Sequence, residues 1–119
     1  MKKILALILV LVLVFGLVGC GSKSKVSPAN TVIAQNVITA VDKYLDKAMS
    51  DSELTTILDK ALDDLDDGGN NMMKLNAVLL GANIALVRLN VTLGGDDSRE
   101  KIVEARNDIA ELVGAKARK

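Results

Sequence analysis

Residues 50–71 read SDSELTTILDKALDDLDDGGNN, and this stretch holds a helix together with the signals for both of its ends. Ser50 and Glu53 have the spacing of a capping box, which starts a helix. The apolar residues that follow lie on one helical face; they are Leu54, Ile57, Leu58, Ala61, Leu62 and Leu65. Gly68 and Gly69 predict its end, because glycine readily adopts the left-handed conformation that follows a helix.

The segment before this stretch carries the same kinds of signal. Ser27 and Pro28 predict an N-cap and a first helical residue, a position where proline loses no hydrogen bond. Apolar residues then recur at steps of three and four and indicate a second amphipathic helix; they are Ala34, Val37, Ile38, Val41, Leu45 and Ala48.

The segment after it predicts two further helices. Asn70 or Asn71 caps a helix through Leu93, which Gly94-Gly95 ends. Asp97 and Glu100 form another capping pair, and the last helix has its own apolar stripe, formed by Ile102, Ala105, Ile109, Leu112 and Val113. Four helices joined by short loops, with no strand-like alternation, predict an all-α fold, a small antiparallel four-helix bundle.

The third helix is apolar almost all round over residues 72–93, and we therefore expect it to be the most buried of the four. Lys74, Gly81 and Arg88 are spaced by seven and lie close to Thr92 on the helical wheel. This line is the predicted solvent edge.

Asn76, Asn83 and Asn90 are also spaced by seven, and we call them the Asn line. Bulky apolar residues flank them, and in a heptad they take position a with leucines at position d; these leucines are Leu79, Leu86 and Leu93. A buried amide without a partner costs roughly 1–3 kcal/mol, so the three must find partners.

Three interpretations of the Asn line remain open. The amides hydrogen-bond within the bundle, to side chains such as Gln35, Asn36 or Thr39 or to buried water. Alternatively, the line is a seam for a second copy or a partner helix, or it lines a cleft for a small polar ligand.

The start of the chain has the features of a targeting signal. Met1-Lys2-Lys3 precedes an apolar run over residues 4–18, which is shorter than the ~20 residues of a membrane-spanning helix. The run ends in Leu17-Val18-Gly19-Cys20, which resembles the lipobox of bacterial lipoproteins. The resemblance covers residues 1–20 only. It implies cleavage between Gly19 and Cys20 and a diacylglyceryl group, with a further acyl chain such as palmitate, on Cys20.

These signals divide the chain into a signal peptide (1–19), a lipidated flexible tether (20–27) and a helical bundle (28–119). The resemblance implies attachment to the extracytoplasmic side of the cell envelope. Gly21 follows the lipobox cysteine, where an Asp would favour retention in the inner membrane. The sequence therefore favours the outer membrane, or the plasma membrane surface of a single-membrane host.

The amino-acid composition argues against several classes of function. Lys and Arg number 15, as do Asp and Glu; loss of Lys2 and Lys3 leaves 13 bases against 15 acids, about −2. This balance argues against nucleic-acid binding. The chain has no His and a single Cys, so zinc sites, His-dependent nucleophilic catalysis and disulfides lack their residues. We predict no catalytic residues and no cofactor beyond the covalent lipid on Cys20.

Four acidic residues crowd the end of the second predicted helix, where the helix dipole disfavours negative charge: Asp63, Asp64, Asp66 and Asp67. A calcium loop counted from Asp64 would need Glu at its twelfth position, which is Leu75. We expect no metal here, and interpret these acids as a solvated end or a contact patch for a basic partner.

The sequence thus predicts a membrane-anchored lipoprotein with a non-enzymatic protein-interaction role in the envelope: an adaptor, an inhibitor or an exclusion-type factor. Its expected partner is an envelope protein. One alternative is a structural lipoprotein that self-associates into a homo-oligomer through the Asn/Leu seam. A third function is a carrier of a small ligand in the bundle interior.

Overall fold

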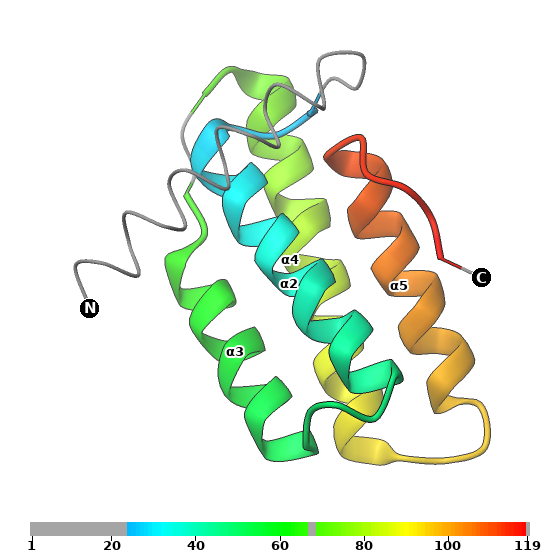
Figure 1. The fold of residues 1–119 in the computed structure, drawn as a ribbon. Helices are drawn as coiled ribbons and strands as arrows, with labels where there is room; N and C mark the ends of the chain where they lie inside the picture. The colour runs from blue at the N-terminus through cyan, green and yellow to red at the C-terminus, as the bar shows by residue number, and fades with distance from the viewer. Residues whose placement is uncertain (1–23, 67–68, 119) are drawn as a thin grey trace.

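The computed structural model describes residues 24–66 and 69–118. These residues form four helices and no strand: α2 (Pro28–Leu45), α3 (Asp51–Asp64), α4 (Asn71–Leu93) and α5 (Ser98–Leu112). Successive helices run in opposite directions, and α2 also packs against α5 (Figure 1). Helices α2 and α4 lie diagonally across the bundle. The predicted all-α four-helix bundle is confirmed.

Three of the predicted helix starts form as expected. Ser27, Ser50 and Asn70 each accept, through a side-chain oxygen, a hydrogen bond from the backbone N–H three residues later, at 3.3, 3.2 and 2.9 Å. Gly94 directly follows α4 with a φ of 55°, which a side chain would disfavour. Each cap satisfies backbone groups that the helix itself leaves without partners.

The start of α5 differs from the prediction. Asp97 precedes the helix in a helical conformation, with φ −89° and ψ −6°, and its side chain makes no capping hydrogen bond. A capping side chain needs the extended backbone that Ser27 and Ser50 adopt. The hydroxyl of Ser98 instead donates to the carbonyl of Gly95 at 2.9 Å.

Two helix ends also come earlier than predicted. Helix α2 ends at Leu45, so Ala48 lies outside its stripe and is exposed. Helix α3 ends at Asp64, because Leu65 already has the extended angles φ −57° and ψ 136°.

The core lies between the four helices and uses the predicted stripes. Its largest fully buried apolar side chains are Leu54, Leu58, Leu80, Ile84, Ile102, Ile109, Val37, Val41 and Val87. In the described part of the chain, every buried side-chain nitrogen or oxygen has a hydrogen-bond partner.

Packing on the bundle extends to residues before Pro28. Val26 is 3% exposed and belongs to the core. Lys25 donates its backbone N–H to the carbonyl of Leu112 at 2.7 Å, and its own carbonyl accepts from Asn76 at 2.9 Å. Residues 24–27, assigned to the tether from sequence, are therefore packed on the bundle. The predicted signal peptide, Cys20 and the rest of the tether lie outside the described residues.

Candidate interaction surface

Helix α4 presents a continuous apolar surface to solvent. All the large hydrophobic residues that are exposed in the described part of the chain lie on this helix, and we call them the α4 outer face. They are Met72, Leu75, Val78, Leu79, Leu86, Leu89 and Leu93, with exposures of 44–68%. The expectation that this helix is the most buried was wrong. A helix at the corner of a four-helix bundle packs against two neighbours, which cover only one side of it, whatever its composition.

The spacing of this surface is regular. The leucine seam, which we define as Leu75, Leu79, Ala82, Leu86, Leu89 and Leu93, alternates steps of four and three residues, and all six are exposed. This is the a/d spacing of a two-stranded coiled coil. At 1.5 Å per residue the seam is about 27 Å long. No charged residue belongs to it.

Helix α3 borders one edge of the α4 outer face. Arg88 Nε donates to the carboxylate of Asp59, and this hydrogen bond and ion pair raise the pKa of Arg88. A Cβ on Gly81 would meet Leu65 at 3.1 Å, so glycine allows α3 to pack closely. The predicted solvent edge is therefore exposed at Lys74, whereas Gly81 and Arg88 are half-buried beside α3.

The Asn line lies along the opposite edge, beside α5. Asn76 and Asn90 are buried, and Asn83 is half-buried. Asn76 donates to Lys25 as described above; Asn83 and Asn90 donate to the carbonyls four residues earlier, at 3.0 and 2.8 Å.

These partners are backbone carbonyls rather than the α2 side chains Gln35, Asn36 and Thr39. Thr39, for example, donates its hydroxyl to the carbonyl of Gln35. The expected partners were wrong because α2 lies diagonal to α4. The exposed seam runs beside the Asn line and not along it.

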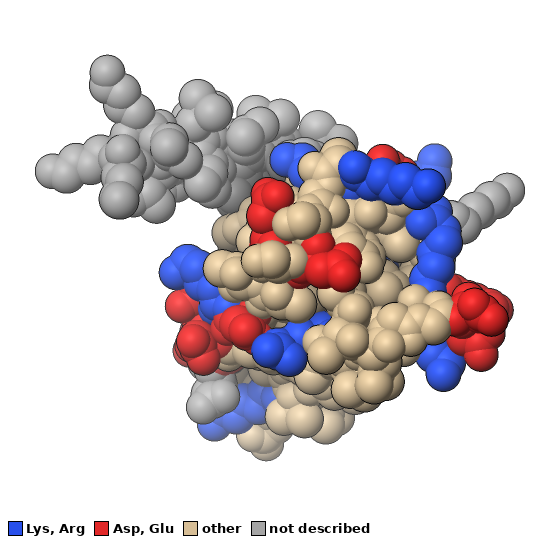
Figure 2. All heavy atoms as spheres, turned by 90° about the horizontal axis from the view of Figure 1, so that it is seen from below, with Lys and Arg blue, Asp and Glu red and all other residues tan. Residues whose placement is uncertain are grey.

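Charged groups flank the uncharged surface without entering it. Figure 2 looks along the bundle from the end that carries the α2–α3 and α4–α5 loops, and it shows charged side chains in separate groups with uncharged surface between them. On the α5 side, Leu86 and Asn90 share a shallow hollow of about 160 Å³ with Lys101, Glu104 and Asp108.

The predicted acidic patch is only partly described. Asp63, Asp64 and Asp66 are exposed, and Asp67 lies outside the described residues. Lys60 pairs with Asp64 at 3.4 Å. The buried side chain of Asn30 holds both backbone groups of Asp66, at 2.7 and 2.8 Å. Among the described residues no group of three or more acidic, Cys or His side chains could hold a metal ion.

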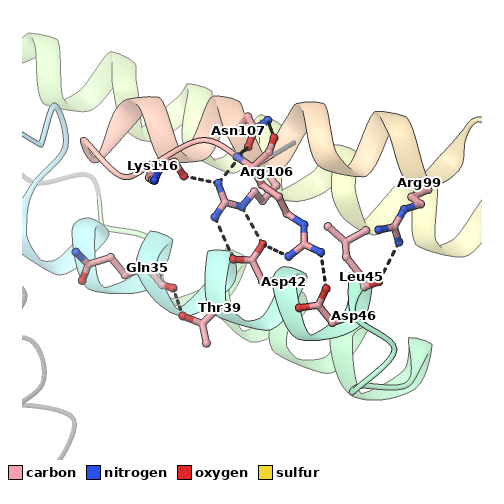
Figure 3. A network of polar contacts seen from close by, with 10 residues as sticks. Gln35, Thr39, Asp42, Leu45, Asp46, Arg99, Arg106, Asn107 and Lys116 are labelled. Atoms are coloured by element: carbon pink, nitrogen blue, oxygen red, sulfur yellow. Dashed lines mark hydrogen bonds and ion pairs between the residues drawn. The ribbon is translucent and has the colours of Figure 1, made fainter.

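A polar network between α2 and α5 was not found from the sequence (Figure 3). Arg106 is 7% exposed and donates to both carboxylate oxygens of Asp42, at 2.9 and 3.0 Å, and to the carbonyl of Lys116 at 2.6 Å. Arg118 pairs with Asp42 and Asp46. The available signal was an arginine within the apolar stripe of the last helix. These hydrogen bonds and ion pairs join the C-terminal segment to α2 and α5. Each charged group in the network has a partner within it.

A second hollow, of about 350 Å³, lies between the α2–α3 loop and the start of α5. Its lining combines apolar side chains with five polar or charged ones, which are Tyr44, Lys47, Asp51, Ser98 and Arg99. Burial, followed by the hydrogen bond and charge of Asp51, raises the pKa of Tyr44. Arg99 donates to the carbonyl of Leu45 at 2.9 Å. The hollow is an open surface feature at a helix junction, outside the bundle interior where a ligand carrier would hold its cargo.

Comparison with known proteins gives no relative: no family model, curated protein or solved structure matches the chain.

Hydropathy adds one further property of α4. Among the described residues, it is the one helix long and apolar enough to cross a membrane, with a mean hydropathy of 1.4 over 18 residues, of which 33% are buried in the bundle. The core helix of a soluble protein meets the same criterion. Hydropathy alone therefore does not indicate whether a lipid or a protein contacts this face. The spacing of its exposed residues and the charges beside it bear on that question.

Proposed function

We propose that this chain is a lipid-anchored bacterial envelope lipoprotein that acts without enzymatic chemistry, by binding another protein chain through the α4 outer face. The observation that carries the proposal is the gathering of seven large, half-exposed hydrophobic residues on one helix. Contiguous apolar surface of more than a few hundred Å² marks sites of protein or membrane contact.

The lipobox-like sequence supports the anchored location. Cys20 and Ser24 are separated by four Cα–Cα steps, which reach at most about 14 Å. Lys25 is hydrogen-bonded to Asn76, near the start of α4. An acylated Cys20 therefore holds that end of α4 close to the membrane and leaves the length of the face available to an extracytoplasmic partner. Two or more acyl chains give stable attachment where one is marginal.

The seam spacing supports a helix as the contacting element. Alternating steps of four and three fit the knobs-into-holes packing of one helix on another. An adaptor, an inhibitor or an exclusion-type factor would each use such a contact. A copy of this chain could make the same contact, because the spacing also suits this helix packed on itself.

Photo-crosslinking in cells of the host bacterium tests the proposal. A photoreactive residue replaces Leu89 in the full-length chain, and a matched probe replaces Asn36, which is exposed on α2. We expect a discrete protein adduct from position 89 and none from position 36. Adducts to lipid alone, or the absence of any protein adduct at position 89, would overturn the interaction role of this face.

A further inference from the structure

We propose that the chain covering the α4 outer face is a second copy of this protein, packed α4 against α4 in parallel. This inference rests on the proposed interaction role of the face and names the partner.

The residues beside the seam carry the first argument. In a two-stranded coiled coil, charged residues next to the a and d positions select partner and orientation. The positions next to the leucine seam are uncharged on both sides: Asn76, Asn83 and Asn90 on one side, Val78, Ala85 and Thr92 on the other. Two identical faces therefore meet without repulsion between like charges along the seam. A charged partner helix would find no complementary charge there.

The same surroundings disfavour a membrane as the cover. Helices that lie in a membrane interface carry Lys and Arg beside their apolar face. The α5 side of this face offers exposed Glu104 and Asp108 beside Lys101. The α3 side offers the exposed Lys74 at one end and Arg88, whose guanidinium is already bound by Asp59.

The size of the face suffices for a weak isologous dimer. A helix with side chains is about 10–12 Å across, so the outer half of 27 Å of helix presents about 500 Å². Two copies then bury about 1,000 Å², the lower limit for a specific interface. Anchoring both copies in one membrane raises their effective concentration, which allows such a modest interface to form.

The connection to the tether selects the parallel arrangement. The carbonyl of Lys25 is hydrogen-bonded to the side chain of Asn76. The tethered end of each copy therefore lies at the N-terminal end of its α4. In a parallel pair both tethered ends lie at the same end of the dimer, where both anchors reach one membrane. An antiparallel pair places these ends on opposite sides of a helix of 23 residues, about 34 Å long.

Single-cysteine crosslinking of the full-length, membrane-bound chain tests the inference. In a parallel pair, Leu75→Cys and Leu89→Cys each face their own counterpart, so each variant alone should give a disulfide-linked dimer on mild oxidation. Asn36→Cys on α2 is the matched control, and the wild-type chain with Cys20 alone is the blank; both should stay monomeric. Leu75 and Leu89 are 56% and 50% exposed, which keeps these substitutions outside the core.

A mixed experiment determines the orientation. Differently tagged Leu75→Cys and Leu89→Cys chains are produced together; a disulfide between them in preference to the self-linked dimers means an antiparallel pair and overturns the parallel arrangement. A photo-adduct at position 89 to a different protein, without self-linked dimers, overturns the second copy but leaves the proposed function intact. No protein adduct and no dimer overturns both.

Discussion

Asn76 donates its side-chain amide to the carbonyl of Lys25 at 2.9 Å and so ties the first turns of α4 to the segment that enters the bundle. The two residues are 51 positions apart in the chain. This one contact places the segment that precedes α2 beside the start of the apolar face.

Asn76→Ala should therefore destabilise the fold. The substitution leaves the partly buried carbonyl of Lys25 without this donor, which costs about 1–2 kcal/mol. The check is thermal unfolding of the purified protein. Asn83→Ala is the matched control, because Asn83 bonds only the carbonyl of its own helix and should cost less. Equal losses in the two variants would contradict the role given to the Lys25 contact.

Leu89→Glu should separate binding from stability. Leu89 is 50% exposed, so its replacement should change the free energy of unfolding by less than about 0.5 kcal/mol. The disulfide-linked dimer formed through Leu75→Cys should nevertheless be lost when Leu89→Glu is added, because a charge would be buried in the contact. Leu80→Ala, at a fully buried position on the same helix, should cost about 2–5 kcal/mol. Denaturant unfolding beside crosslinking distinguishes the two effects.

Arg106→Ala should be among the most destabilising polar substitutions. It leaves Asp42 without its bidentate partner in a largely buried site, and breaking such a pair costs about 3–5 kcal/mol. Arg88→Ala removes the exposed pair with Asp59 and should cost less than about 1 kcal/mol. Denaturant midpoints of the two variants test this ranking, which fails if Arg88→Ala costs as much.

The carboxyl of Asp46 should titrate below its ordinary pKa of 3.8, chiefly because of its hydrogen bond from Arg118. Since the folded pKa is the lower one, this pair stabilises the fold above pH 3.8 and loses its effect as the pH falls through the folded pKa. The effect on stability should be small, because the pair is solvent-exposed. An NMR titration should show the Asp46 pKa rising toward 3.8 in Arg118→Ala. It should change less in Arg99→Ala, because the charge of Arg99 is the smallest cause of the shift.

Cys20→Ser should abolish lipid attachment. We expect loss of labelling by a palmitate analogue and accumulation of the uncleaved precursor, visible as a larger band. Ser22→Ala serves as the control, since it changes the tether without removing the thiol. Labelling that persists in Cys20→Ser would exclude Cys20 as the lipid site.

Local sequence determined the helices of this protein. Ser27, Ser50 and Asn70 cap helices where the sequence predicts them, because a cap is a contact between residues three positions apart. Apolar spacing predicted the core stripes and hence the four-helix bundle. The cap at Asp97 failed because it depends on a backbone conformation that its residue type does not impose.

Only the tertiary structure decided which side of α4 is covered. Periodicity identifies a buried face by its contrast with polar residues, and a helix that is apolar almost all round supplies little contrast. The positions of α3 and α5 leave Leu75, Leu89 and Leu93 in solvent and bury Leu80 and Ile84 instead. The long-range pairs of Asn76 with Lys25 and of Arg106 with Asp42 likewise exist only once the helices are packed, because their partners are far apart in the chain.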